Sequence, residues 1–132
     1  MIGLDTNVVV RLFANDDQAQ RAASVRLIDS LPPGEKALIN SVVLAELLWT
    51  LRRVYRFERD QSAQVVRKLS EHPNIQLADL DVVRDAAHRY REEGGDIVDH
   101  VIALTNRDRG CRFTFTFDED AAACSDFALL ES

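Results

Sequence analysis

The chain has 132 residues, enough for one domain with a sizeable hydrophobic core. Hydrophobic residues make up 46% of it and charged residues 29%, a balance that excludes a disordered protein. The 22 acidic and 16 basic residues give a net charge of −6. A net negative charge argues against a nucleic-acid partner unless the basic residues gather on one surface.

From the sequence we expect neither a secretory signal nor a membrane-spanning segment. The first residues lack a positive segment and include Asp5, so we expect no secretory signal. The most apolar stretch, 42–51, is interrupted by Glu46 and is too short to cross a membrane. Cys111 and Cys124 lack the spacing of a metal-binding pair, and we expect two unpaired thiols in a reducing cytoplasm.

Short apolar segments alternate with helical patterns along the whole chain. In the first half we predict strand 1–4, helix 6–14, helix 18–31, strand 37–39, helix 41–55 and a helix from residue 60. In the second half we predict strand 75–78, helix 81–93, helix 96–109, strand 113–117, a short helix and strand 127–130. Side chains able to cap these helices are Thr6 or Asn7, Asn40 or Ser41, Asp60, Asp81 and Asp96.

This alternation is typical of βαβ units and predicts an α/β fold. We expect a single domain over residues 1–132, with a central parallel sheet covered by helices on both faces. Ligands of such sheets bind beyond the carboxyl ends of the strands. Polar residues at those ends are therefore the first candidates for a functional site.

Four acidic residues map to that edge of the predicted sheet. Asp5 and Asp118 end the strands 1–4 and 113–117, while Glu46 and Asp99 lie early in two helices. The residues around Glu46 are apolar on nearly every side, so we expect this carboxylate to be buried. A buried carboxylate needs a cation, either a metal ion or an arginine. Asp5, Asp99 and Asp118 have the simpler alternative of a helix cap or a turn.

Taken together, the four acids predict a divalent metal site. Clustered carboxylates repel one another unless a cation lies among them. Oxygen ligands without cysteine or histidine suit Mg²⁺ or Mn²⁺. One or two such ions are the usual apparatus for phosphodiester hydrolysis.

The ordered segments 4–7, 45–47, 96–103 and 114–118 resemble the PIN-domain ribonucleases, and most closely the VapC-type toxins of bacterial toxin–antitoxin pairs. The resemblance implies a three-layer α/β/α fold and an RNA substrate cleaved by metal-activated water. It also implies a homodimer and an antitoxin that blocks the site.

By position, the resemblance implies that Asp5, Glu46, Asp99 and Asp118 bind the metal. Asp96 is a further candidate ligand that ranks below Asp99, and a helix cap is the favoured explanation for it. Supporting roles fall to Thr6, Asn7 and Thr116. His100 stands where the family commonly has a small residue, and we expect it to point away from Asp99.

Arginine accounts for 14 of the 16 basic residues and is suited to bidentate phosphate contacts. Tyr55 and Phe57 lie among the arginines and could stack on bases or pack against a protein partner. The candidate RNA contacts near the end of helix 41–55 are Arg52, Arg53, Arg56 and Arg59.

Two other fold classes do not fit the sequence. A phosphoacceptor receiver domain needs a lysine near its end, and the last lysine here is Lys68. A dinucleotide-binding domain needs a GxGxxG loop, which the chain lacks. A PIN-like domain that binds or regulates without cleaving stays open as the alternative function.

Overall fold

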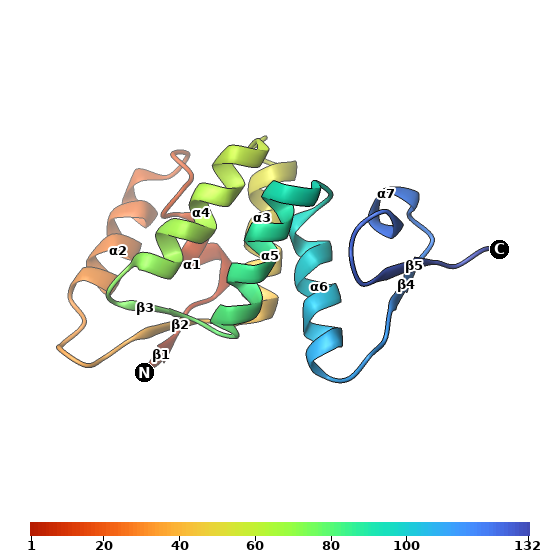
Figure 1. Cartoon of the computed structure of the whole chain (residues 1–132). Helices are drawn as coiled ribbons and strands as arrows, with labels where there is room; N and C mark the ends of the chain where they lie inside the picture. Colours follow the sequence, from red (N-terminus) through yellow and green to blue (C-terminus); the bar gives the residue numbers. More distant parts are fainter. The chain divides into compact units, whose positions relative to one another are not determined.

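The computed structural model describes residues 1–132, which divide into two compact units, Met1–Leu80 and Asp81–Ser132. Both units combine helices with parallel strands (Figure 1). The predicted α/β class is therefore confirmed. The helices are all too short or too polar to span a lipid bilayer.

The N-terminal unit is built on a three-stranded parallel sheet in the order β1-β2-β3 (Figure 1). Its strands are β1 (Ile2–Gly3), β2 (Ala37–Ile39) and β3 (Ile75–Leu77). Parallel neighbours need crossover connections, which the helices supply. The helices are α1 (Thr6–Val10) and α2 (Gln18–Asp29) between β1 and β2, and α3 (Ser41–Arg53) and α4 (Arg59–Glu71) between β2 and β3.

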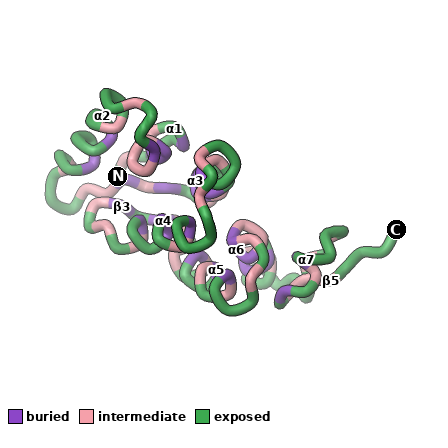
Figure 2. The backbone as a smooth tube through the Cα atoms, turned by 90° about the horizontal axis from the view of Figure 1, so that it is seen from above, coloured by how far each residue is buried: buried purple, intermediate pink, exposed green.

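The core of this unit is aliphatic. Ala37 and Ile39 of β2 are almost fully buried, as are Val9 of α1 and Leu47 and Leu51 of α3. Burying a leucine or valine side chain contributes about 1.5–3 kcal/mol, so this core is the main stabilising element of the unit. Buried and exposed stretches alternate along the helices, as amphipathic packing requires (Figure 2).

The C-terminal unit has a smaller sheet, in which β4 (Thr114–Thr116) pairs with β5 (Phe127–Leu129). Its helices are α5 (Leu80–Glu93), α6 (Ile97–Asp108) and α7 (Glu119–Ala122). Val83, Ala86, Tyr90, Ala103 and Leu104 form its buried core. The phenylalanines on either side of and within β4 are exposed, as is the tail beyond β5 (Figure 2).

At three helix starts the predicted capping residue was wrong. Helix α1 is capped by Asp5, whose Oδ1 accepts from the Thr6 amide at 2.7 Å, and not by Thr6 or Asn7. Helix α4 begins one residue before Asp60, because Glu58 and Gln61 form a capping box. Helix α5 begins at Leu80, so Asp81 lies in its first turn.

Two predicted caps are confirmed. The Asn40 side chain accepts from the Val43 amide at 2.9 Å and begins α3. The Asp96 side chain accepts from the Val98 amide at 2.8 Å and begins α6. Both side chains satisfy amides that the first helical turn leaves unpaired.

Candidate metal-binding carboxylates

Asp5 and Glu46 come together in the N-terminal unit through Thr6. Asp5 follows β1 after one residue, Leu4, and caps α1, so it lies at the carboxyl end of that strand. The Thr6 hydroxyl donates to Oε2 of Glu46, 40 residues away on α3, at 3.1 Å. Thr6 is buried, and its side chain is therefore held in place by packing as well as by this bond. The predicted supporting role of Thr6 has a physical basis in this contact.

Glu46 is exposed, and the prediction of a buried carboxylate was wrong. The apolar residues on its side of α3, Val42 and Trp49, are themselves 67% and 58% exposed. A helix that is apolar all round still buries only the side that faces the sheet. Glu46 also bonds to Thr6 and not to an arginine, so a buried ion pair does not explain it.

In the C-terminal unit, Asp99 and Asp118 share one neighbour, Cys124. Burial raises the pKa of the Cys124 thiol, and so do the nearby carboxylates of Glu93, Asp99, Asp120 and Asp118. Asp99 is half-buried in the first turn of α6. Two acids that sequence reasoning placed on one edge are thus close to the same buried sulfur.

Asp118 caps the short helix α7. Its Oδ1 accepts from the Asp120 amide at 2.9 Å and from the Ala121 amide at 3.4 Å. The Thr116 hydroxyl accepts from the Asp118 amide at 3.0 Å and fixes the turn after β4. This bond joins Thr116 to Asp118, and the supporting role that the resemblance implies for Thr116 stays a prediction.

The caps are compatible with metal binding. Asp5 and Asp118 both cap through Oδ1, and Oδ2 is left for another partner. Glu46 likewise receives the Thr6 bond on Oε2 alone. The donor set consists of carboxylate oxygens, which is the ligand chemistry that Mg²⁺ and Mn²⁺ prefer.

Asp5 and Glu46 share the contact with Thr6, and Asp99 and Asp118 both lie near Cys124. No group of three or more histidine, cysteine, aspartate or glutamate side chains is arranged as a metal site. The four-ligand set stays a prediction. The same holds for Asp96 as a ligand, and for Asn7, which is exposed on α1.

His100 is fully buried, and its Nε2 lies 2.7 Å from the carbonyl oxygen of Gly94. The ring is thus directed at the turn between α5 and α6. It anchors the segment that precedes Asp99. Sequence reasoning expected the ring to point away from Asp99, and this contact gives it a structural role.

The comparison with protein families agrees with this arrangement. The PIN domain family matches residues 2–126. The chain belongs to the PIN-domain family. Members of this family are generally nucleases and typically use divalent metal ions, so the chain has a nuclease fold. Among curated proteins, no sequence matches the chain.

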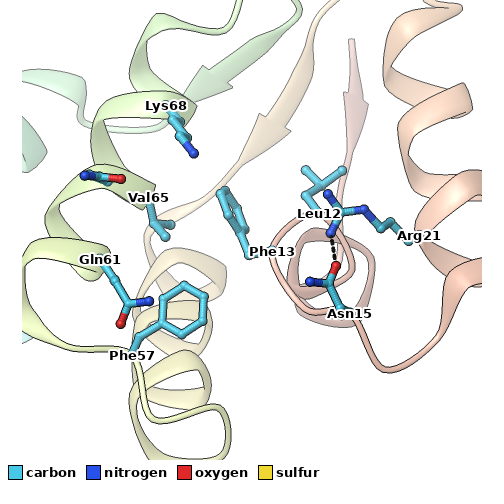
Figure 3. Close-up of a pocket in the computed structure, with 9 residues that line it drawn as sticks. Leu12, Phe13, Asn15, Arg21, Phe57, Gln61, Val65 and Lys68 are labelled. Carbon is cyan, nitrogen blue, oxygen red and sulfur yellow. Dashed lines mark hydrogen bonds between the residues drawn. The ribbon is translucent and has the colours of Figure 1, made fainter.

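The N-terminal unit of this PIN domain also contains a cavity of about 270 Å³ (Figure 3). The Phe13 ring points into it between α4 and the loop after α1, with Val65 and Lys68 on the α4 side. Arg21 borders it and donates to Asn15 at 2.7 Å. No aspartate or glutamate lines the cavity, so it is separate from the candidate metal ligands.

The candidate RNA-binding arginines of the PIN domain are exposed where α3 ends and α4 begins. Tyr55 and Phe57 are half-buried; the Tyr55 hydroxyl donates to Asp16 Oδ2 at 2.7 Å, and Phe57 lines the cavity. Sequence reasoning missed Trp49, whose ring lies 5.6 Å from the guanidinium carbon of Arg53. The sequence feature that could have drawn attention to Trp49 is its position three residues after Glu46, which places both residues on one side of a helix.

Proposed function

We propose that this PIN domain is a Mg²⁺- or Mn²⁺-dependent endoribonuclease that hydrolyses RNA with water. One or two ions would be bound by Asp5, Glu46, Asp99 and Asp118. The observation that supports this most strongly is the contact chain Asp5–Thr6–Glu46 at the carboxyl end of β1. It brings two carboxylates from distant parts of the sequence together without an arginine to neutralise them.

The residues of the chain would position the ligands. Capping holds Asp5 and Asp118 through one oxygen each, and the other oxygen would be available to a metal ion. Thr6 fixes one oxygen of Glu46, and Thr116 fixes the turn that carries Asp118. A bound divalent ion would polarise the phosphoryl group and lower the pKa of a water molecule. Ligand orientation by such neighbours typically changes metal affinity or activity by about 10- to 100-fold.

The decisive experiment is cleavage of structured RNAs by the purified protein with Mn²⁺ or with a chelator. We expect cleavage only with the ion, and a loss of about 100-fold or more in Asp99→Asn. Asp17→Asn is the matched control, because Asp17 caps α2 and is not a candidate ligand, and asparagine caps a helix as well as aspartate does. Cleavage that persists in the chelator, or equal rates for wild type and Asp99→Asn, would contradict the proposal. RNA binding without any cleavage would favour the alternative, a catalytically silent regulatory domain.

We further propose that the protein is the toxin of a VapC-type toxin–antitoxin pair, acting in the cytoplasm as a homodimer and inhibited by a cognate antitoxin. This proposal is supported by the four ordered segments that resemble such toxins and by membership of the PIN-domain family. Expression of the wild-type chain should arrest bacterial growth, and Asp99→Asn should not. Co-expression of the product of a small neighbouring reading frame should restore growth. Unimpaired growth with well-folded wild-type protein would contradict the toxin role.

A further inference from the structure

One face of α3 is exposed and chemically unusual. Val42, Glu46, Trp49 and Arg53 follow one another at helical spacing of three or four residues, so they share one face. Val42 is 67% and Trp49 is 58% exposed. The face thus presents a carboxylate, a large aromatic ring and a cation in a row.

Trp49 and Arg53 form a preorganised pair. The Arg53 guanidinium carbon lies 5.6 Å from the centre of the Trp49 ring, which is cation–π geometry. The arginine restrains the indole, yet more than half of the residue is open to solvent. An indole held in this way loses little further freedom when a second ring stacks on it.

The charge around this pair suits a polyanion. Arg52, Arg53, Arg56 and Arg59 lie within the 11 residues that start at Trp49, and Glu58 is the only acid there. Glu58 is engaged in the capping box of α4. The acidic chain therefore has a locally positive segment directly beside Glu46, which is the charge pattern that attracts phosphates.

We propose that Trp49 stacks on a nucleobase beside the scissile phosphate and that Arg53 contacts the phosphate of an adjoining nucleotide. The inference rests on the proposed ribonuclease function and names the substrate contact of the same site. From Glu46 to Arg53 the helix rises about 10 Å, the length of about three stacked nucleotides. The RNA strand would follow α3 along the face that carries Glu46.

Trp49 is the only tryptophan of the chain, so its fluorescence reports on this contact directly. The probe is a fluorescein-labelled single-stranded RNA of ten nucleotides in mixed sequence, with a chelator to prevent cleavage. We expect this RNA to quench Trp49 emission. In anisotropy titrations Trp49→Ala should weaken binding about 10-fold, and Trp49→Phe should weaken it less. Arg53→Ala should weaken binding and reduce the slope of log affinity against log salt by about 0.7.

Two matched controls separate stacking from general surface effects. Val25→Ala removes an exposed apolar side chain from α2, away from this face, and Arg67→Ala removes an exposed cation from α4. Both should bind RNA as wild type does. Thermal unfolding of each variant checks that it is folded.

An unquenched Trp49 with unchanged RNA affinity in Trp49→Ala would overturn the inference. So would a Trp49→Ala variant that changes only the oligomeric state in light scattering, because Trp49 would then belong to a protein interface. Quenching and weakened binding without any cleavage in Mn²⁺ would support the contact and contradict the ribonuclease proposal. The two proposals can therefore fail independently.

Discussion

The two units position their acidic residues by different physical means. In the N-terminal unit, Asp5 and Glu46 lie on elements anchored by a three-stranded sheet and an aliphatic core, with Thr6 between them. In the C-terminal unit, Asp99 and Asp118 lie in the first turn of one helix and at the cap of another. A side-chain contact across 40 residues therefore joins the first pair, whereas each acid of the second pair stands at a helix start near Cys124.

The two sheets also differ in how far their side chains are buried. The three-stranded sheet buries most side chains of β2 and β3, while the two-stranded sheet exposes Phe115 at 63% and leaves Phe113 and Phe117 exposed beside it. Two strands alone contribute little stability. The C-terminal unit depends more on polar ties, such as the Arg89–Asp126 ion pair at 2.6 Å and the Glu93–Ser125 bond at 2.8 Å. That amide bond from Ser125 is the main reason why the pKa of Glu93 is lowered.

The largest expected effect comes from neutralising one acid in each unit. Asp5→Asn and Asp118→Asn both keep a capping oxygen, so the thermal midpoint should stay close to wild type. Cleavage of RNA in Mn²⁺ should fall about 100-fold or more in both variants, because each loses a proposed metal ligand. Single-turnover rates and thermal unfolding measure the two properties separately. A wild-type rate in either variant would remove that unit from the metal site.

Gly95→Ala tests the dependence of the C-terminal unit on its turn. Gly95 has φ +75°, and an added Cβ would lie 2.9 Å from the buried Cys124 sulfur. We expect a loss of about 2–3 kcal/mol in the free energy of unfolding, from left-handed strain and the steric clash together.

Gly110→Ala is the control for that substitution, because Gly110 has φ +93° with open space around its Cβ position. It should lose only about 1–2 kcal/mol, the cost of the strain alone. Urea unfolding compares the two, and the double variant Gly95→Ala/Cys124→Ala should recover part of the difference. Equal losses for Gly95→Ala and Gly110→Ala would show that the contact with Cys124 is unimportant.

Thr6→Val tests how the N-terminal pair is joined. The substitution preserves shape but removes the hydroxyl that donates to Glu46, at a cost of about 1 kcal/mol in stability. Cleavage should fall about 10-fold, as expected when an orienting neighbour of a ligand is lost. Thr6→Ser retains the hydroxyl and should keep most of the activity. Equal activity of the valine and serine variants would mean that Glu46 needs no orienting bond.

The smallest effect concerns Tyr55 and Asp16. Their hydrogen bond lowers the pKa of Asp16 below its ordinary 3.8 and raises that of Tyr55 above its ordinary 10.0. The contribution of Asp16 to stability is present above pH 3.8 and is lost as the pH falls through its lowered folded pKa. The contribution of Tyr55 is present below pH 10 and is lost as the pH rises through its raised folded pKa.

Tyr55→Phe should therefore flatten the pH dependence of stability at both extremes and leave it little changed near neutrality. Urea midpoints from pH 2.5 to 11 would measure this. A variant curve that is parallel to that of wild type across the range would show that the exposed bond contributes nothing measurable.

Local signals predicted the secondary structure closely. Strand 37–39 matches β2, and Asn40 and Asp96 cap the helices that the sequence assigned to them. Such patterns are local, since a cap needs only a polar side chain and the amides two or three residues on. The prediction that Asp60 caps α4 was wrong for an equally local reason. Glu58 and Gln61 form reciprocal bonds that cap this helix instead.

The sequence by itself determined the order of strands and helices, the four acids and their places at strand ends and helix starts. It also determined the arginine-rich segment, because composition and spacing are written along the chain. Only the tertiary structure decided that Thr6 reaches Glu46 across 40 residues and that the side of α3 carrying Glu46 and Trp49 faces solvent. The sequence of a helix that is apolar nearly all round does not indicate which side the sheet will cover, so tertiary packing determines which side is buried.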